Sequence, residues 1–212
     1  MGKHVSRICL FGGTFNPIHM GHLAFAQSVQ RDFQLDELIL LPSKIPPHKD
    51  VLGATPLDRY KMVELAVKAL GAGFAASDYE INAEGVSYTY KTIKHWRTLH
   101  PDSALFFAAG SDIFKSIGTW GSWESRFFLA HFIIVYREGV SLDEMIAAIP
   151  QTHLPRIKSV YEPATFSDKF GSILLYNMPP VPISSTHIRV NIAQERLPEA
   201  VYNYIVENKL YI

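Results

Sequence analysis

The chain has 212 residues, of which 48% are hydrophobic and 19% charged, and its 20 basic and 20 acidic side chains leave no formal net charge. This composition excludes a disordered chain, and the charge balance argues against a general nucleic-acid binder, which would carry a basic face. The single cysteine, Cys9, excludes a disulfide framework and a cysteine-based zinc site within the chain. The longest apolar run, Phe127 to Tyr136, is far short of a membrane span, and the N-terminus lacks the apolar core of a signal peptide. We therefore expect a cytoplasmic protein without membrane or nucleic-acid partners.

Short apolar runs alternate along the chain with segments of helical spacing. The expected strands are Arg7–Phe11, Glu37–Leu41, Phe74–Asn82, Ala104–Ala109, His131–Tyr136 and Ile173–Tyr176. The expected helices are Gly21–Phe33, a helix capped by Thr55 and ended by Gly71, Tyr88–His100, Leu142–Ile149, Ser185–Gln194 and Pro198–Asn208. The proline-rich stretch Pro42–Thr55 is expected to be a loop, and Pro150–Gly171 shows no readable pattern.

Strands that alternate with helices at this spacing predict an α/β fold, a Rossmann-like doubly wound parallel sheet with helices on both faces. Residues 1–212 are expected to form one domain. The C-terminal helices, residues 185–212, are expected to pack on the same core through Val201, Tyr204, Ile205 and Asn208. Ligands of such sheets bind at the carboxyl ends of the strands, which directs attention to the loops after Phe11, Leu41, Ala109, Tyr136 and Tyr176.

The loop after the first strand has the features of an anion site. Residues 12–22 read Gly-Gly-Thr-Phe-Asn-Pro-Ile-His-Met-Gly-His, which is neither the dinucleotide fingerprint nor a P-loop. Gly12 and Gly13 allow close approach of the backbone, and the following helix directs N–H groups and a positive dipole end at the same point. His19 and His22 share one face of that helix start. A zinc site on this histidine pair lacks a third ligand nearby, so no protein metal site is predicted.

A second anion-like element lies near the C-terminus. Residues 183–189 read Ile-Ser-Ser-Thr-His-Ile-Arg, which places hydroxyl groups at a helix start and Arg189 about one turn inside it. A guanidinium binds phosphate oxygens in a bidentate manner. Alone this segment fits an ordinary helix cap, but together with the first loop it indicates two helix starts that converge on one polyphosphate.

These two segments resemble the signatures of the nucleotidyltransferases with the HxGH motif. Pro46-Pro47-His48-Lys49, Ser87-Tyr88-Thr89-Tyr90 and Gly110-Ser111-Asp112 with Trp120 are similar to the bacterial nicotinate-nucleotide adenylyltransferase branch of that superfamily. The matches run in family order over nearly the whole chain. The resemblance implies the nucleotidyltransferase fold and adenylyl transfer from ATP to nicotinate mononucleotide, a step of NAD biosynthesis that forms deamido-NAD.

The resemblance also implies roles for single residues. The implied catalytic residues are His19, His22 and Arg189. The implied ATP-binding residues are Gly12, Gly13, Thr14, Phe15, Gly110, Asp112, Arg137, Ser184, Ser185 and Thr186, with Asp112 on a ribose hydroxyl and Arg137 near the adenosine. The implied acceptor-binding residues are His48, Lys49, Tyr88, Thr89 and Trp120, with the Thr89 backbone at the nicotinate carboxylate and Trp120 stacked on the pyridine ring. Mg²⁺ is expected to arrive on the ATP phosphates.

Several alternatives stay open at this point. Gly121 follows Trp120 where the family often has an aromatic residue, so the acceptor could be the amidated mononucleotide, NMN, or the substrate of another HxGH nucleotidyltransferase. A non-catalytic nucleotide sensor is a weaker hypothesis, because such a domain has no need of His19, His22 and Arg189 together. The sequence does not decide whether the chain forms a homo-oligomer.

Overall fold

The structure, a computed structural model, describes residues 5–45, 53–110, 129–136, 142–147, 149, 151–158, 171–178 and 181–211. Its strands form one seven-stranded sheet in the order β3-β2-β1-β4-β5-β7-β6, and every neighbouring pair is parallel. The strands are β1 (Arg7–Gly13), β2 (Glu37–Pro42), β3 (Phe74–Ala76), β4 (Ala104–Gly110), β5 (His131–Tyr136), β6 (Ile157–Lys158) and β7 (Ile173–Asn177). The predicted doubly wound parallel sheet is confirmed.

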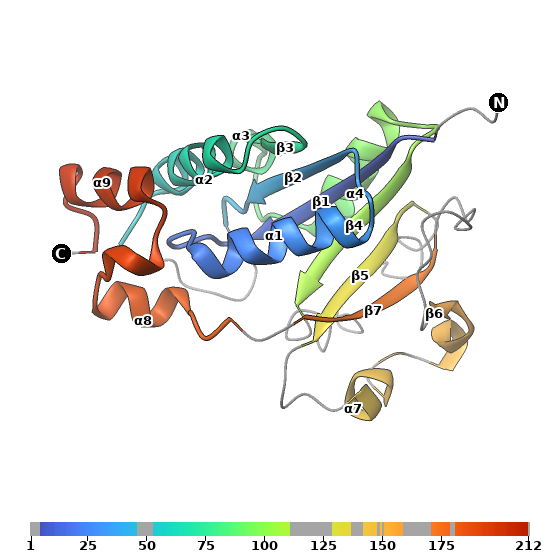
Figure 1. The fold of residues 1–212 in the computed structure, drawn as a ribbon. Helices are drawn as coiled ribbons and strands as arrows, with labels where there is room; N and C mark the ends of the chain where they lie inside the picture. Colours follow the sequence, from blue (N-terminus) through green and yellow to red (C-terminus); the bar gives the residue numbers. More distant parts are fainter. Residues whose placement is uncertain are drawn as a thin grey trace.

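Helices connect these strands. The α-helices of the described residues are α1 (Met20–Asp32), α2 (Pro56–Leu70), α3 (Tyr79–Asn82), α4 (Thr89–Leu99), α7 (Leu142–Ala147), α8 (Ser185–Val190) and α9 (Glu199–Glu207). Two 3-10 turns, η2 (Gln151–Arg156) and η3 (Gln194–Arg196), complete the set. Figure 1 shows α1 in front of the sheet and α4 behind it.

Alternate residues of β1 enter two separate hydrophobic cores, because successive side chains of a strand point to opposite faces. Cys9 and Phe11 pack with α1, α2, α8 and α9 on one face. Ile8 and Leu10 pack with Ile93 of α4 on the other face. Both faces of the sheet are therefore covered by apolar packing, as a parallel sheet requires.

The strand order places the topological switch point between β1 and β4. The chain runs outward from β1 to β2 and β3, and then returns to the other side of β1 as β4. The loops that leave β1 and β4 at their carboxyl ends diverge there, which opens a crevice position for a ligand. The residues after β1 and at Gly110 therefore lie where this fold binds ligands.

The start of α2 follows the predicted pattern. The Thr55 hydroxyl accepts a hydrogen bond from the Asp58 backbone N–H at 3.1 Å, and the Thr55 backbone N–H donates to the Asp58 carboxylate at 3.0 Å. This reciprocal capping box satisfies two N–H groups that the first turn leaves open. Pro56 occupies the first helical position, where its missing N–H costs nothing.

The C-terminal helix packs on the core through the residues that its spacing indicates. Val201 and Ile205 are fully buried and belong to the same hydrophobic cluster as β1 and α2. Tyr204 is partly buried, while Asn208 is exposed, which corrects the expectation that it packs on the core.

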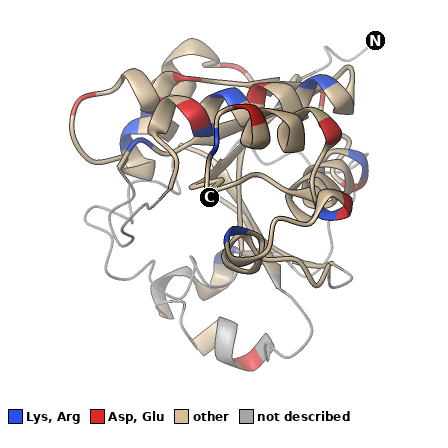
Figure 2. Cartoon of the chain, turned by 90° about the vertical axis from the view of Figure 1, so that its left-hand side faces the viewer, with Lys and Arg blue, Asp and Glu red and all other residues tan. Residues whose placement is uncertain are grey.

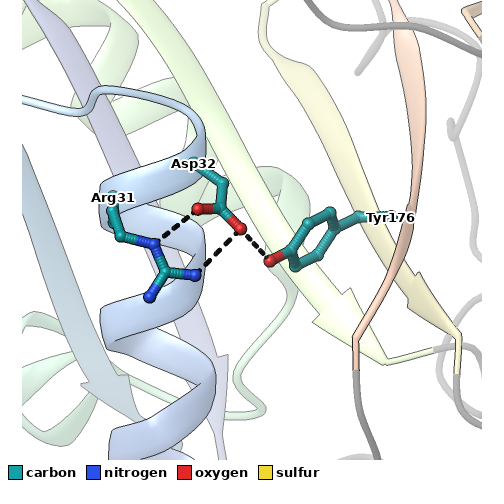
Figure 3. A network of polar contacts seen from close by, with 3 residues as sticks. All are labelled: Arg31, Asp32 and Tyr176. Atoms are coloured by element: carbon teal, nitrogen blue, oxygen red, sulfur yellow. Dashed lines mark hydrogen bonds and ion pairs between the residues drawn. The ribbon is translucent and has the colours of Figure 1, made fainter.

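A polar network joins the end of α1 to β7, as Figure 3 shows. Arg31 donates two hydrogen bonds to Asp32, at 2.6 and 3.1 Å, and the Tyr176 hydroxyl donates to the same carboxylate. The hydrogen bond from Arg31 is the main reason why the pKa of Asp32 lies below its usual value. Burial, aided by the Asp32 charge, raises the pKa of Tyr176 to about 12, so the phenol remains a donor at neutral pH.

Three sequence-based boundaries are corrected by the structure. The strand expected over Phe74–Asn82 ends at Ala76 and is followed by α3, because the Ser77 hydroxyl accepts the Tyr79 N–H and starts a helical turn. The helix expected over Ser185–Gln194 ends at Val190, where Asn191 is extended. The helix expected over Leu142–Ile149 is shorter and ends at Ala147. The segment Pro150–Gly171, for which the sequence predicted no element, contributes η2 and the edge strand β6.

Candidate functional site

His19 and His22 form a stacked pair at the start of α1, immediately beyond β1. Their ring centroids lie 3.7 Å apart, and His19 is only 4% exposed. The His19 backbone N–H donates to Nδ1 of His22 at 3.2 Å. An imidazole whose Nδ1 accepts a hydrogen bond carries its proton on Nε2. Nε2 of His22 is therefore the nitrogen that can donate to a phosphate oxygen at this helix start.

The glycine turn before the histidines is filled by the loop's own aromatic ring. Phe15 is 2% exposed, and a Cβ on Gly13 would lie only 2.8 Å from the Phe15 ring. Phe15 also makes an edge contact with His22, at 5.1 Å between ring centroids. The Phe15 side chain thus supports the His22 ring from the core, which leaves only its backbone for the expected contact with ATP.

Helix α8 is hydrogen-bonded directly to the loop after β1. The Ser185 hydroxyl donates to the Pro17 carbonyl at 3.0 Å, and the Arg189 guanidinium donates to the Asn16 carbonyl at 2.8 Å. Arg189 also donates to the Thr186 hydroxyl at 3.2 Å. A guanidinium has five N–H donors, so these two contacts leave Arg189 able to bind a phosphate. The two anion-like segments, which lie at opposite ends of the sequence, are therefore hydrogen-bonded to each other.

Ser184 serves as the N-cap of α8. Its hydroxyl accepts the His187 backbone N–H at 3.3 Å, which is the ordinary capping role that the sequence also allowed. Ser184 and Ser185 are half-buried, and Thr186 is exposed. Ser184, Ser185 and Thr186 therefore bring three hydroxyl groups to the start of α8, in the turn before Arg189.

A buried arginine holds the carboxyl ends of β1 and β2 together. Arg59 of α2 is 1% exposed, and its guanidinium donates to the carbonyls of Thr14 (2.7 Å), Ser43 (2.6 Å) and Lys44 (3.0 Å). Burial lowers the pKa of Arg59 from its usual value, but an arginine remains charged at neutral pH. The cation fixes the backbone on which the first loop is built.

The predicted acceptor segment lies beside the end of β2. The Lys44 backbone N–H donates to the Ser87 hydroxyl at 2.9 Å, and the Ser87 N–H donates to the Ile45 carbonyl at 3.1 Å. Tyr88 is the N-cap of α4 and is half exposed, and Thr89 is the first residue of that helix. The first-turn N–H groups of α4 are therefore held near the carboxyl edge of β2, where they can bind an anionic group.

The buried carboxyl of Glu80 is hydrogen-bonded to the acceptor segment. Glu80 is 7% exposed, and the Thr92 hydroxyl donates to its carboxyl at 2.6 Å. Burial raises the pKa of Glu80, and hydrogen bonds from Thr92 and Ser87 oppose the shift. Glu80 thus connects α3 to α4 and to Ser87 at the start of the acceptor segment.

The structure places some of the predicted residues and not others. Gly110 ends β4 beside β1 and pairs with Val135 of β5, at the switch point. The predicted residues that lie outside the described ranges are His48, Lys49, Asp112, Trp120 and Arg137. Their roles, and those of the described residues in binding ATP and the acceptor, stay predictions.

Arg59 and Glu80 were not identified from the sequence. Arg59 precedes Met62, Val63 and Ala66 at helical spacing on the buried face of α2, so a charged residue on an apolar stripe was the available signal. Nothing in the local pattern around Glu80 distinguishes it from a solvent-facing carboxylate.

Charges of both signs are interspersed along the described helices, as Figure 2 shows. Within the described ranges, no group of three or more His, Cys, Asp or Glu side chains could hold a metal ion. No helix in the part of the chain that the structure describes is long and apolar enough to cross a membrane.

Comparison with known proteins identifies relatives over almost the whole chain. The family model described as Cytidylyltransferase-like matches residues 10–191. A probable nicotinate-nucleotide adenylyltransferase of Desulfatibacillum aliphaticivorans is 38% identical over 220 residues, which cover 97% of this chain and 100% of the relative. A protein of the same description from Clostridium acetobutylicum is 36% identical over 211 residues, covering 96% of this chain and 98% of the relative.

A solved structure shares the fold. The structure of Plasmodium falciparum nicotinic acid mononucleotide adenylyltransferase complexed with NaAD matches with a TM-score of 0.73 and 20% sequence identity, over 97% of each chain. The predicted nucleotidyltransferase fold is thereby confirmed.

Proposed function

The chain belongs to the nicotinate-nucleotide adenylyltransferase family, and we propose that it transfers the adenylyl group of ATP to nicotinate mononucleotide at the site between β1 and α8. The products are deamido-NAD and pyrophosphate. The observation that carries this assignment is the direct hydrogen bonding of Ser185 and Arg189 to the loop that holds His19 and His22. We assign the triphosphate of ATP to these two groups of donors.

The chemistry requires positioning and charge stabilisation rather than a strong base. A phosphate oxygen of the acceptor attacks the α-phosphorus of ATP and forms a new P–O bond. The bond from that phosphorus to the bridging oxygen breaks, and its electron pair leaves with pyrophosphate. The nucleophile is already an oxyanion near neutral pH, so catalysis depends on orientation and on donors that meet the growing negative charge.

His22 and Arg189 are the groups that we assign to this charge. Nε2 of His22 is the donor at the helix start, and the N–H groups of the first turn of α1 add to the same positive field. Arg189 donates to the Asn16 carbonyl of the same loop, and we assign it to the β- and γ-phosphates as pyrophosphate forms. Ser184, Ser185 and Thr186 supply hydroxyl groups to the same oxygens.

Mg²⁺ is expected to enter with ATP, where it neutralises part of the phosphate charge. The side chains that we assign to the phosphates are imidazoles, hydroxyls and a guanidinium, and none of them is a carboxylate, the usual protein ligand of Mg²⁺. The phosphates themselves would therefore carry the ion.

The acceptor is assigned to the start of α4. The nicotinate carboxylate differs from the carboxamide of NMN by its negative charge, and the N–H groups at a helix start favour an anion. We assign the Thr89 backbone N–H, at the start of α4, to that contact, with Tyr88 beside it. His48, Lys49 and Trp120 are proposed to complete the acceptor side, and Asp112 and Arg137 the adenosine side.

We also propose that the whole chain acts as one domain in the cytoplasm. The core that contains β1 also contains Val201 and Ile205 of α9, which supports a single folding unit. The thiol of Cys9 is fully buried, and burial raises its pKa, which suits an inert cysteine in a reducing compartment.

The direct test is pyrophosphate release by the purified chain with Mg-ATP, in parallel reactions with nicotinate mononucleotide and NMN, and with the dinucleotide product identified by mass. We expect a strong preference for the nicotinate form. Preference for NMN would keep the fold and the reaction type but overturn the acceptor assignment. Nucleotide binding without release from either acceptor would favour another acceptor or a sensor.

A further inference from the structure

The side chain of Tyr211, close to the C-terminus, reaches the loop that leads into the histidine pair. Its hydroxyl donates to the side-chain carbonyl of Asn16 at 2.6 Å. The ring lies against Gly53, where a Cβ would be only 2.6 Å from Cδ1 of the tyrosine. The backbone of Tyr211 has a φ of 63°, a conformation that a tyrosine rarely adopts. The contacts of the ring and hydroxyl therefore determine where this residue lies.

Asn16 is the point where three segments of the chain meet. Its side chain accepts from Tyr211, its backbone carbonyl accepts from Arg189, and the next carbonyl, of Pro17, accepts from Ser185. Asn16 is 6% exposed and precedes His19 by three residues. A displacement of Asn16 would therefore move both the carbonyl that holds Arg189 and the chain that leads into the histidine pair.

Two guanidinium groups lie close enough to Tyr211 to act on its phenol. Burial raises the pKa of Tyr211, and the charges of Arg59 and Arg189 partly oppose that shift. The phenol therefore remains protonated at neutral pH and keeps its role as a donor.

We propose that Tyr211 is a positioning residue for ATP: its hydroxyl holds Asn16, and through Asn16 it orients Arg189 and the loop before His19 for the triphosphate. This role rests on the proposed function only in that the nucleotide is ATP. It does not depend on which acceptor the chain uses. The proposed role is positioning through Asn16, and not contact with the reacting atoms. The C-terminal residues of the chain are therefore part of the nucleotide site, and not only of the hydrophobic core.

The test removes the hydroxyl alone. In Tyr211→Phe the ring still fills the space beside Gly53, and the hydrogen bond to Asn16 is lost. A net hydrogen bond accounts for about a three- to tenfold change in an equilibrium constant, so we expect the Kd and KM for Mg-ATP to rise by about that factor. The KM for the acceptor should stay within about twofold of the original value.

Tyr204→Phe is the matched control. Tyr204 is also a C-terminal tyrosine with a hydrogen-bonded hydroxyl, but it donates to Asp58 of α2 at 3.0 Å. A purely structural contribution of a phenol would lower the melting temperature of both variants and leave Mg-ATP binding unchanged in both. Positioning predicts weaker Mg-ATP binding in Tyr211→Phe only.

Calorimetric titration with Mg-ATP, without acceptor, keeps this test independent of the proposed acceptor. An unchanged Kd in Tyr211→Phe, or an equal rise in Tyr204→Phe, would overturn the positioning role.

A double-mutant cycle with Asn16→Ala provides the second measurement: the effect of Tyr211→Phe on the Kd should disappear when Asn16 is already truncated. Additive effects would overturn the proposed route through Asn16. Failure of the wild-type chain to use nicotinate mononucleotide would refute the proposed acceptor and leave this comparison intact.

Discussion

The buried guanidinium of Arg59 provides a prediction that combines stability with function. Arg59→Met keeps the apolar stem and removes three hydrogen bonds to the carbonyls of Thr14, Ser43 and Lys44. At about 1 kcal/mol net for each bond, the free energy of unfolding should fall by about 3 kcal/mol. Urea unfolding followed by tryptophan fluorescence measures this change. Since the three carbonyls fix the ends of β1 and β2, Mg-ATP should also bind more weakly.

Arg97 offers the matched control, because it lies at the amino-terminal ends of the strands, opposite the loops of the site. Its guanidinium donates to backbone carbonyls of Leu129 (2.9 Å), His100 (3.0 Å) and Ser103 (2.7 Å), with a longer contact to Pro101 (3.3 Å). These carbonyls lie before β4 and β5, away from the loops of the site. Arg97→Met should therefore lose a similar free energy of unfolding, about 3 kcal/mol, with the Kd for Mg-ATP unchanged.

Either of two results would refute this reasoning. A loss below about 1 kcal/mol in Arg59→Met would mean that water replaces the guanidinium at the carbonyls without penalty. An equal loss of Mg-ATP affinity in both variants would mean that general destabilisation, and not the local backbone, weakens the site.

Two further predictions concern the acceptor side. The raised pKa of Glu80 means that the folded state binds its proton more tightly than the unfolded state, so stability falls as pH rises from the ordinary value of 4.5 through the folded value. Glu80→Gln keeps a hydrogen-bond acceptor for Thr92 and has no carboxyl to titrate. In urea unfolding from about pH 4.5 to 7.5, the free energy of unfolding of this variant should therefore increase relative to that of wild type as the pH rises. A difference that does not vary with pH would contradict the assignment. Trp120→Ala should weaken acceptor binding by about 1–3 kcal/mol if the ring stacks on the pyridine, as the KM of each substrate would show. Equal losses for ATP and the acceptor would exclude stacking.

Much of the fold could be predicted from periodicity and helix caps. The strand runs around Cys9, Leu38 and Phe106 are continuous apolar segments, which is typical of strands buried on both faces, and Thr55 with Pro56 marks the start of α2. The strand near Phe74 was predicted too long, since Ser77 and Asp78 start a helical turn and do not continue the strand. Hydrogen bonds between a side chain and the nearby backbone determined this boundary, and residue periodicity does not register them.

The residues proposed for the site could be named from the sequence where one short segment holds several of them. His19, His22 and Arg189 stand in short motifs, and the structure brings these motifs together. Arg59 and Tyr211 escaped prediction because their partners are backbone carbonyls and a side chain far away in the sequence. Such contacts depend on the tertiary fold: the apolar stripe of α2 indicates that Arg59 is buried, but no local pattern indicates which groups Arg59 and Tyr211 contact.

We propose that adenylyl transfer takes place at the histidine pair and uses the His22 imidazole. The most direct measurement is the rate of deamido-NAD formation in a single turnover, with saturating Mg-ATP and nicotinate mononucleotide, for wild type and His22→Ala. Loss of a donor that acts on transition-state charge should lower this rate at least about tenfold, with the unfolding transition unchanged. Equal rates in the two proteins would contradict the assignment of His22 to catalysis.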